Sequence, residues 1–261
     1  MTLTPEIESL IAAGALFVLN HSGGKDSQAM MIKLLDLVPA SQILVVHASL
    51  GEAEWEGALE LARDQAADAG VPFLVARAAK SFLDMVDQRF AARPGVPSWP
   101  SAAQRQCTSD LKRDPIAREV RRYMKQRGLH LVVNCTGIRA QESASRAKVR
   151  TFQPSKRNST AGRTWYEWAP IHDMTTLEVF ATIAAAGQEP HPAYAAGNDR
   201  LSCVFCIFGS ASDIARGAEA RPELFAQYVA REQRTGYTMH MSRLSLVEIV
   251  AKAKAAAQVA A

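Results

Sequence analysis

The residues best suited to chemistry in this chain form a polar turn, Ser22–Ser27, with the sequence Ser-Gly-Gly-Lys-Asp-Ser. An apolar run typical of a buried strand, residues 15–19, precedes it, and residues 28–35 follow with the pattern of a helix. Glycines let the backbone approach a ligand closely, and the free amides of a helix N-terminus attract anions. Hydroxyl and ammonium donors strengthen such a site. The predicted phosphate-binding residues are Ser22, Gly23, Gly24, Lys25, Asp26 and Ser27.

The remaining elements must hold this turn in place, and their pattern predicts an α/β fold. Strands that alternate with helices indicate a mostly parallel sheet covered on both faces, and ligands bind beyond the carboxyl ends of its strands. A proline-rich segment, residues 93–100, is expected to be an ordered loop. The further predicted strands are 42–47, 73–76 and 129–134, and the predicted helices are 53–69, 81–90, 114–128 and 245–260.

Composition places the chain among soluble globular proteins, with 48% hydrophobic and 21% charged residues in 261. No apolar run reaches membrane-spanning length, and the first residues lack a basic, signal-like start. We therefore expect a cytoplasmic location and no membrane partner. Four cysteines in a chain of this size favour metal or redox chemistry over a disulfide framework.

A second polar motif, residues 137–146, follows the strand predicted at 129–134. Its Gly-Ile-Arg turn and a later arginine place two guanidinium groups, Arg139 and Arg146, where they can bind phosphate oxygens bidentately. The alternative is a solvated helix start with ion pairs between successive turns. The motif contributes Gly137, Arg139, Glu142 and Arg146 to the predicted site.

Three cysteines form the third signal. Cys203 and Cys206 make a C-x-x-C pair, and Cys107 lies far upstream, so folding can close a metal site between two segments. An iron–sulfur cluster is one candidate occupant. Zinc is the other, with a histidine as fourth ligand. Cys135 is expected to be a buried core residue. The histidines that could complete a zinc site are His172, His191 and His240.

Residues 146–163 contain six Lys or Arg and no acidic residue, and Trp165, Tyr166 and Trp168 follow. Basic side chains beside aromatic ones suit a nucleic acid, through phosphate contacts and base stacking. The basic helix predicted at 114–128 adds to this charge. The alternative is a lid over the nucleotide with its aromatics in the core.

Taken together, these motifs resemble a known family. Ser-Gly-Gly-Lys-Asp-Ser is similar to the PP-loop of the ATP pyrophosphatases, which bind ATP through its pyrophosphate. The ordered set resembles the phosphoadenosine phosphosulfate (PAPS) reductase family, which includes sulfonucleotide reductases and DNA phosphorothioation sulfurtransferases. The motifs that carry the resemblance are the PP-loop, Gly137–Ser143, Trp168–Asp173, His191–Tyr194 and Gly197–Cys206.

The resemblance implies an adenine nucleotide α-hydrolase-like (Rossmann-like) fold: a doubly wound, mostly parallel five-stranded sheet with a helical C-terminal region. It implies a PP-loop domain over residues 1–200 and a C-x-x-C segment with helices over residues 201–261. It also implies ATP or a related adenine nucleotide with Mg²⁺, catalysis by Lys25, Asp26 and Arg139, and a [4Fe-4S] cluster on Cys107, Cys203 and Cys206. The residues it places beside the adenine are His47, Ala48 and Ser49.

Two departures from the cluster-containing reductases bear on the reaction. Those enzymes carry a Cys-Cys pair where this chain has Gln106-Cys107, and a catalytic cysteine near the C-terminus where no cysteine follows Cys206. We therefore predict an ATP-dependent sulfurtransferase that adenylates an acceptor, expected to be a nucleic acid. A cysteine desulfurase as sulfur donor and a homodimer are also expected. The alternatives are a sulfonucleotide reductase that releases sulfite and a non-catalytic nucleotide-binding regulatory module.

Overall fold

The computed structural model describes residues 3–260, and its central element is one six-stranded sheet. The strand order is β3-β2-β1-β4-β6-β5. β1 pairs in parallel with β2 and β4, β4 pairs in parallel with β6, and β5 pairs antiparallel with β6. The strands are β1 (Leu16–Asn20), β2 (Ile43–Ser49), β3 (Phe73–Arg77), β4 (Leu131–Cys135), β5 (Phe152–Pro154) and β6 (Thr164–Trp168).

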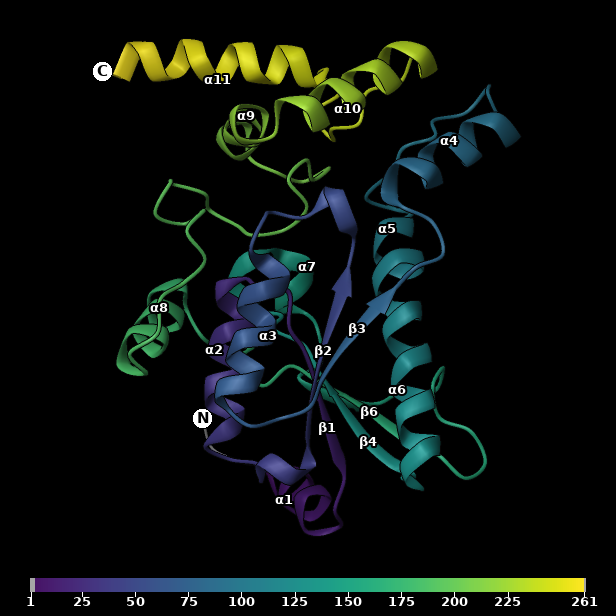
Figure 1. Cartoon of the computed structure of the whole chain (residues 1–261), viewed down its shortest axis with the longest axis vertical. Coiled ribbons are helices and arrows are strands. Elements are labelled where there is room, and N and C mark those ends of the chain that lie inside the picture. Colours follow the sequence, from purple (N-terminus) through teal and green to yellow (C-terminus); the bar gives the residue numbers. More distant parts are fainter. Residues whose placement is uncertain (1–2, 261) are drawn as a thin grey trace. The chain divides into compact units, whose positions relative to one another are not determined.

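Helices alternate with the first four strands, as the sequence predicts (Figure 1). Short 3-10 turns lie at η1 (Ala40–Gln42), η2 (Gly51–Ala53) and η4 (Ala140–Glu142), and a π-helical turn lies at η3 (Ser109–Arg113). The helices are α1 (Pro5–Ala12), α2 (Lys25–Leu35), α3 (Ala58–Asp68), α4 (Phe82–Ala92), α5 (Gln106–Thr108), α6 (Asp114–Arg127), α7 (Ala144–Ala147), α8 (Thr176–Ala185), α9 (Ala211–Ala220), α10 (Pro222–Thr235) and α11 (Leu246–Ala260).

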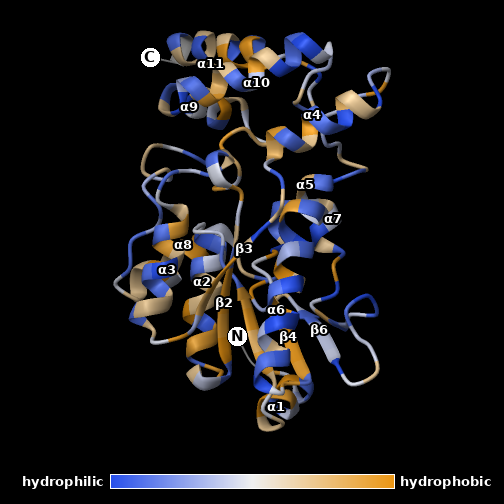
Figure 2. Cartoon of the chain, turned by 45° about the vertical axis from the view of Figure 1, so that its right-hand side comes forward, coloured by the Kyte–Doolittle hydropathy of each residue, from blue (hydrophilic) through white to orange (hydrophobic). Residues whose placement is uncertain are grey.

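The sheet is covered by helices on both faces, as expected for a parallel sheet. Alternate residues of β1 point to opposite faces: Phe17 and Leu19 pack with α1, α2 and α3, whereas Leu16 and Val18 pack with α6. In Figure 2, β2 and β4 appear as hydrophobic runs, β6 is paler, and the helices carry both hydrophobic and hydrophilic residues. No helix in residues 3–260 combines the length and the apolar character that a bilayer crossing requires.

The α/β class and the mostly parallel sheet are confirmed, but the expected number of five strands is wrong. The sixth strand, β5, is only three residues long and pairs with β6 at the edge of the sheet. Its sequence, Phe-Gln-Pro, lies within the basic segment and is too short to show a strand periodicity. β6 itself holds Trp165, Tyr166 and Trp168, which makes these aromatics part of the sheet.

By internal contacts the chain forms two compact units, each assembled from separate segments. The first unit (residues 1–48, 57–76 and 115–191) contains most of the sheet with α1–α3 and α6–α8. The second unit (residues 49–56, 77–114 and 192–261) contains α4, α5 and α9–α11. Its core holds the stacked rings of Phe82, Trp99 and Tyr228. A domain boundary at residue 200 stays a prediction.

Candidate nucleotide-binding turn and cysteine group

The Ser22–Ser27 turn leaves β1 and enters α2, which begins at Lys25 after Gly24 in the N-cap position. Gly23 has a φ of 74°, and a Cβ at this position would lie 2.4 Å from the carbonyl oxygen of Ala58. Both the backbone conformation and the close approach of α3 therefore require glycine. The first amides of α2 have no acceptor within the helix and carry the positive end of its dipole, which suits a phosphate group.

A network of charged side chains occupies the start of α2. Lys25 is 3% exposed, and its Nζ lies 3.6 Å from Oδ2 of Asp26 and 5.9 Å from the ring centre of Phe180. The other carboxylate oxygen of Asp26, Oδ1, accepts a 2.6 Å hydrogen bond from Nε of Arg139. Asp26 thus joins two cations, and its observed contacts are those of a residue that positions the turn.

Arg139 is almost fully enclosed, with a 3% exposed side chain. Besides Asp26, its guanidinium donates to the Gln141 side chain, the Met174 carbonyl oxygen and the Thr176 hydroxyl, at 3.1–3.2 Å. These partners come from three parts of the chain and fix the planar group in one orientation. A direct contact between Arg139 and a phosphate stays a prediction.

The second motif packs directly on the turn, as expected. A Cβ on Gly137 would lie 3.1 Å from the backbone carbon of Asp26, so the two segments approach as closely as glycine permits. Oε2 of Glu142 accepts from the Arg139 amide at 3.0 Å and pairs with the Arg146 guanidinium. The predicted residues of the two motifs therefore lie together, and Glu142 holds Arg146 through an i,i+4 ion pair.

Two backbone amides of the turn already have acceptors within the protein. The Ser22 amide donates to the Ser27 hydroxyl at 3.2 Å, and the Gly23 amide donates to Nδ1 of His21 at 3.1 Å. The Ser27 hydroxyl in turn donates to the Gly24 carbonyl oxygen at 2.8 Å. Ser27 is 4% exposed, so its side chain braces the turn, whereas Ser22 is exposed.

The residues expected beside an adenine lie at the end of β2. His47 is 1% exposed, and its Nδ1 donates to the carbonyl oxygen of His21 at 2.8 Å. Ser49 is 9% exposed, and its hydroxyl accepts from the Gly51 amide at 3.4 Å. Ala48 is partly exposed. His47 supports the backbone before the turn, and the adenine contacts of all three residues stay predictions.

Cys107, Cys203 and Cys206 all belong to the second unit and are free thiols. Burial raises the pKa of Cys107, and the charge of Cys206 raises it further. Burial also raises the pKa of Cys203. The charge of Lys112 lowers this pKa, whereas the charges of Cys206 and Cys107 raise it. The three sulfurs therefore interact electrostatically. Between residues 3 and 260, however, no group of three or more His, Cys, Asp or Glu side chains is arranged to hold a metal ion.

The fourth cysteine and the candidate zinc histidines have other surroundings. Cys135 is fully buried in the sheet core. His172 places Nδ1 3.0 Å from the Asp173 carboxylate and Nε2 3.0 Å from the Arg146 carbonyl oxygen. Nε2 of His240 donates to the Gly209 carbonyl oxygen at 2.9 Å. His191 is 4% exposed in the first unit.

The basic segment is divided between α7, β5 and the loop that leads to β6. Lys148, Arg150, Lys156 and Arg157 are exposed, as a nucleic-acid surface requires. The aromatics do not offer stacking platforms: Trp165 and Trp168 are 1% and 7% exposed, and Tyr166 stacks on Phe152 at 5.1 Å. The expectation of base stacking by the tryptophans is wrong, because both faces of the sheet are covered: Trp165 packs on the side of α6, and Trp168 packs on the side of α2.

Several residues that support the site were not predicted from the sequence. His21 accepts a hydrogen bond from the Gly23 amide of the turn, and Thr176 accepts one from Arg139. Thr176 opens α8 after a capping box formed by Thr175 and Glu178, a Thr-x-x-Glu pattern that can be read from sequence. His21 precedes the turn directly, but only its burial and its ring contacts reveal its role.

Comparison with known proteins gives matches in sequence and in structure. The chain is 30% identical over 135 residues to an uncharacterized 37.8 kDa protein in the gpa 5' region of Escherichia phage 186, a match that covers 52% of this chain and 39% of the phage protein. The chain thus spans about two-fifths of the length of that relative.

Among solved structures, a phosphoadenylyl-sulfate reductase from Candida auris, in a phosphate complex, matches with a TM-score of 0.47 and 15% identity over 78% of this chain and 97% of that one. An FMN adenylyltransferase from Candida glabrata, solved with FAD and inorganic pyrophosphate, matches with a TM-score of 0.46 and 10% identity over 73% of this chain and 55% of that one.

The family assignment rests on a longer match. The sequence profile of the phosphoadenosine phosphosulfate reductase domain matches residues 17–208, which include the turn, the Gly137–Arg146 motif, and Cys107, Cys203 and Cys206. The matched range covers well over half of the chain and both compact units contribute to it. The chain belongs to the phosphoadenosine phosphosulfate reductase domain family, a family of PP-loop enzymes that use nucleotides.

Proposed function

We propose that this protein is an ATP-dependent sulfurtransferase that activates an acceptor by adenylation and then inserts sulfur. The observation that carries the proposal is the buried Lys25 ammonium at the start of α2, held by Asp26 beside the positive end of the helix dipole. A cation in a site of low dielectric stabilises developing phosphate charge far better than it does in water.

In the first step, an acceptor oxygen attacks the α-phosphorus of ATP, and pyrophosphate leaves with the electron pair of the broken phosphorus–oxygen bond. The Ser22–Ser27 turn binds the leaving pyrophosphate, and Lys25 neutralises its charge. Asp26 and Arg139 orient Lys25 and the first turn of α2. Mg²⁺ enters as the counter-ion of the nucleotide phosphates, since both carboxylate oxygens of Asp26 are already paired with cations.

In the second step, a sulfide-level nucleophile bonds to the activated acceptor atom while the bond to the adenylate oxygen breaks and AMP leaves. A cysteine desulfurase is the proposed source of sulfur; its persulfide must first be reduced by two electrons from a thiol. Cys107, Cys203 and Cys206 are the proposed ligands of a [4Fe-4S] cluster, which would supply redox and sulfur chemistry when bound. Their thiol chemistry and their shared unit support this ligand set.

The proposed acceptor is a nucleic acid. The exposed basic residues of the 146–163 segment support it, since binding through phosphates requires only accessible positive charge. The net charge of the chain is +4. Because the tryptophans of β6 are buried, the contacts that we propose are to the phosphate backbone and not to the faces of the bases.

The test is pyrophosphate release from ATP and Mg²⁺ in the presence of DNA or transfer RNA. We expect Lys25→Ala to lower the rate about 100-fold or more, as removal of a charge-stabilising group does. Lys33→Ala, in the last turn of the same helix, is the matched control and should keep the wild-type rate. An unchanged rate in Lys25→Ala would refute the role of Lys25.

The family match also favours a second function, reduction of a sulfonucleotide. Incubation with an adenylylated sulfate and a dithiol distinguishes the two reactions, because the reductase would release sulfite and would not need ATP. Tight nucleotide binding with neither sulfite nor pyrophosphate release would instead indicate a regulatory module.

A further inference from the structure

His21, which no motif includes, lies between β1 and the Ser22–Ser27 turn and is held at several points. It is 1% exposed, and its amide donates to the Val46 carbonyl oxygen at 2.9 Å. Its carbonyl oxygen accepts from Nδ1 of His47, and its own Nδ1 accepts from the Gly23 amide. The ring therefore determines the direction of one amide in the turn.

These contacts fix the chemical state of the His21 ring. Nδ1 accepts a hydrogen bond, so it carries no proton, and a neutral imidazole must then carry its proton on Nε2. Burial lowers the pKa of His21 to about 3, and the nearby His47 lowers it too, so the ring is neutral at physiological pH. The protonated Nε2 is thus a buried donor that needs an acceptor.

The candidate acceptor is the side chain of Gln65 in α3, which is 8% exposed. Within the described residues, neither His21 Nε2 nor Gln65 Oε1 has a partner of normal hydrogen-bond geometry. Hydrogen bonding by Gln65 nevertheless acts on the pKa of His21, against the effect of burial, so the two side chains are close. One group lacks an acceptor and the other lacks a donor, and a single hydrogen bond would satisfy both.

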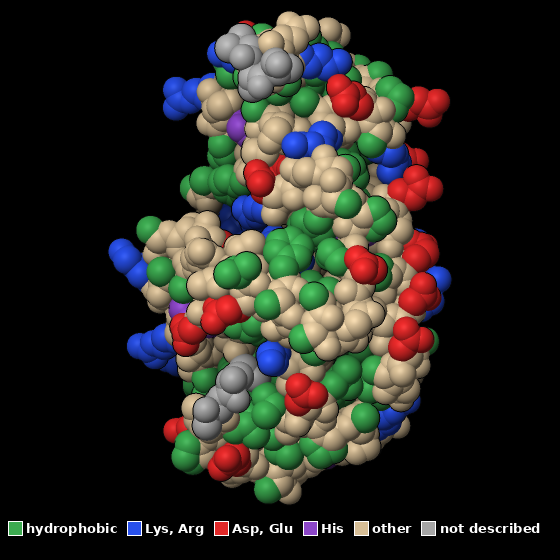
Figure 3. Space-filling model, turned by 90° about the vertical axis from the view of Figure 1, so that its left-hand side faces the viewer, with side chains coloured by type: hydrophobic (Ala, Val, Ile, Leu, Met, Phe, Trp, Pro, Cys, Tyr) green, Lys and Arg blue, Asp and Glu red, His purple; other side chains and the backbone are tan. Residues whose placement is uncertain are grey.

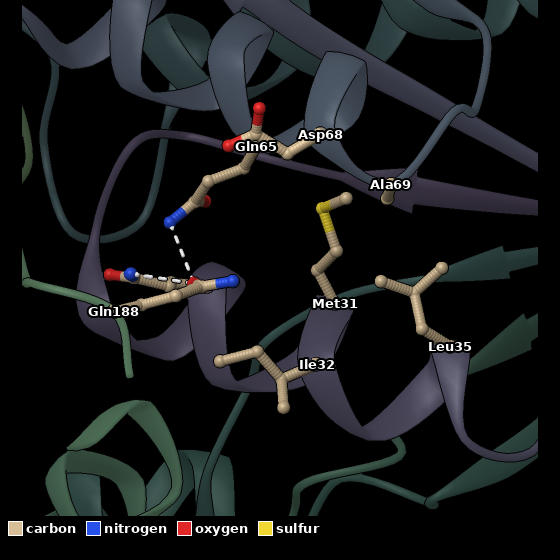
Figure 4. Close-up of a pocket in the computed structure, with 8 residues that line it drawn as sticks. Met31, Ile32, Leu35, Gln65, Asp68, Ala69 and Gln188 are labelled. Carbon is tan, nitrogen blue, oxygen red and sulfur yellow. Dashed lines mark hydrogen bonds between the residues drawn. The ribbon is translucent and has the colours of Figure 1, made fainter. Parts of the chain in front are cut away.

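Gln65 is itself held by a cluster of amides, which Figure 4 shows beside a cavity of ≈ 180 Å³. Nε2 of Gln65 donates to Oε1 of Gln188 at 3.1 Å, and Nε2 of Gln28 donates to the same oxygen at 3.0 Å. Gln28 also donates to the Glu189 carbonyl oxygen at 3.1 Å. These bonds fix which end of the Gln65 amide is oxygen, and they leave Oε1 to face away from Gln188.

We propose that Gln65 accepts a hydrogen bond from Nε2–H of His21, and that His21 through its Nδ1 sets the position of the Gly23 amide. His21 and Gln65 are then positioning residues for the phosphate turn, linking α3 and the residues after α8 to the nucleotide site. The Gly23 amide, the His21 ring and the Gln65 amide then form one continuous series of hydrogen bonds, in which each bond polarises the next. The inference rests on the proposed nucleotide role of the Ser22–Ser27 turn.

The first test needs no substitution and no activity. In the full chain labelled with ¹⁵N at histidine, the imidazole shifts of His21 should show a neutral ring with the proton on Nε2 at neutral pH. A proton on Nδ1, or a doubly protonated ring, would overturn the proposal whether or not the protein binds ATP.

The second test measures the dissociation constant for Mg²⁺–ATP and for inorganic pyrophosphate in Gln65→Met. Loss of the acceptor should raise both constants about tenfold, the effect of one well-placed hydrogen bond. The matched control is Gln42→Met, since Gln42 also donates one hydrogen bond and has a buried, unpartnered Oε1, but lies before β2.

Equal dissociation constants in the Gln65 and Gln42 variants would refute the positioning role. If Gln65→Met does not fold, the histidine shifts of the unmodified chain still decide the question. If the unmodified chain binds neither ligand but shows the expected His21 state, the proposed function fails, whereas the tautomer that the His21–Gln65 bond requires stands.

Discussion

At the scale of single residues, the conformation of the Ser22–Ser27 turn depends on groups that contact other parts of the protein. Gly23 admits the backbone of α3, Ser27 braces the loop, and Arg139 fixes Asp26. Each of these residues acts by excluding other positions for the amides and the ammonium that would bind phosphate. Preorganised donors of this kind are effective because they need not reorient during a reaction.

Replacement of Gly23 tests how tightly the turn is packed. Gly23→Ala introduces a Cβ at 2.4 Å from the Ala58 oxygen as well as an unfavourable φ of 74°. Gly14→Ala is the matched control, because its φ is 72° but its Cβ would contact nothing within 4 Å. We expect Gly14→Ala to cost about 1–2 kcal/mol of unfolding free energy. Gly23→Ala should cost roughly 1–3 kcal/mol more, measured by urea denaturation. Equal losses in the two variants would contradict the close contact with α3.

Arg139 is expected to matter for stability as much as for function. Arg139→Ala leaves Asp26 short of a partner, and removal of one member of a buried ion pair typically costs about 3–5 kcal/mol. Arg139→Lys should recover little of this, since an ammonium cannot replace a planar fork with four partners. The exposed Arg122, paired with Glu119, is the control, and its alanine variant should unfold at the wild-type urea midpoint.

At the scale of elements, the Ser22–Ser27 turn and the Gly137–Arg146 motif meet because the parallel strands β1 and β4 are neighbours. Both strands release their chains at the same edge of the sheet, so Gly137 comes to lie on the first turn of α2. The loop after β4 is then secured at a second point, where the ring of His172 contacts the backbone of α7.

This His172 contact predicts a dependence of stability on pH. The hydrogen bond to the Arg146 carbonyl oxygen raises the pKa of His172 most, and the Asp173 side chain raises it further. Both ring nitrogens face acceptors, and only the protonated ring can donate to both at once. Because the pKa is raised in the folded state, protonated His172 stabilises the folded protein, and this contribution is complete below the ordinary histidine pKa of about 6.5. It is lost as pH rises through the raised value.

Thermal unfolding of the wild type and of His172→Gln, each at pH 5.5 and pH 8.5, tests this sign. The wild type should have the higher melting temperature, and its difference from the variant should be larger at pH 5.5 than at pH 8.5. His130→Gln is the control, since His130 is exposed and has one carbonyl partner. A larger difference at pH 8.5 would show that the ring is held in its neutral form.

At the scale of the whole molecule, the chain passes between two units repeatedly, and each unit holds one of the two candidate sites. The Ser22–Ser27 turn belongs to the first unit, and Cys107, Cys203 and Cys206 belong to the second. The surface charge is mixed: the face drawn in Figure 3 carries both basic and acidic side chains, and many of the acidic ones lie toward the right-hand edge of the view. A nucleic acid would therefore be held by local basic groups, and its binding should weaken as salt rises.

The cysteine group gives the prediction that belongs to this scale. After anaerobic purification we expect visible absorption, bound iron and acid-labile sulfide, all lost in Cys107→Ser, Cys203→Ser and Cys206→Ser. Cys135→Ser is the control, since Cys135 is buried in the sheet core of the other unit, and it should keep the iron content. A colourless wild-type protein that contains zinc would contradict the cluster assignment.

Much of the candidate site follows from local sequence, because strand, turn and helix are neighbours in the chain. The apolar run before Ser22 and the helical pattern after Ser27 predict a strand, a turn and a helix N-terminus, and the structure has these three elements. The alternation of strands and helices predicts the parallel sheet for the same reason. Short or irregular elements such as β5 and η3 were not predicted, since three to five residues show no periodicity.

The sequence by itself determined the family, through short motifs in a fixed order, as well as the α/β class and the strand–turn–helix around Ser22–Ser27. Only the tertiary structure decided that Arg139 binds Asp26, that the tryptophans of β6 are buried, and that His21 holds the Gly23 amide. The physical reason is that a side chain's partners depend on burial and on contacts between distant segments. The Asp26–Arg139 bond joins residues 113 positions apart, a distance over which no local pattern carries information.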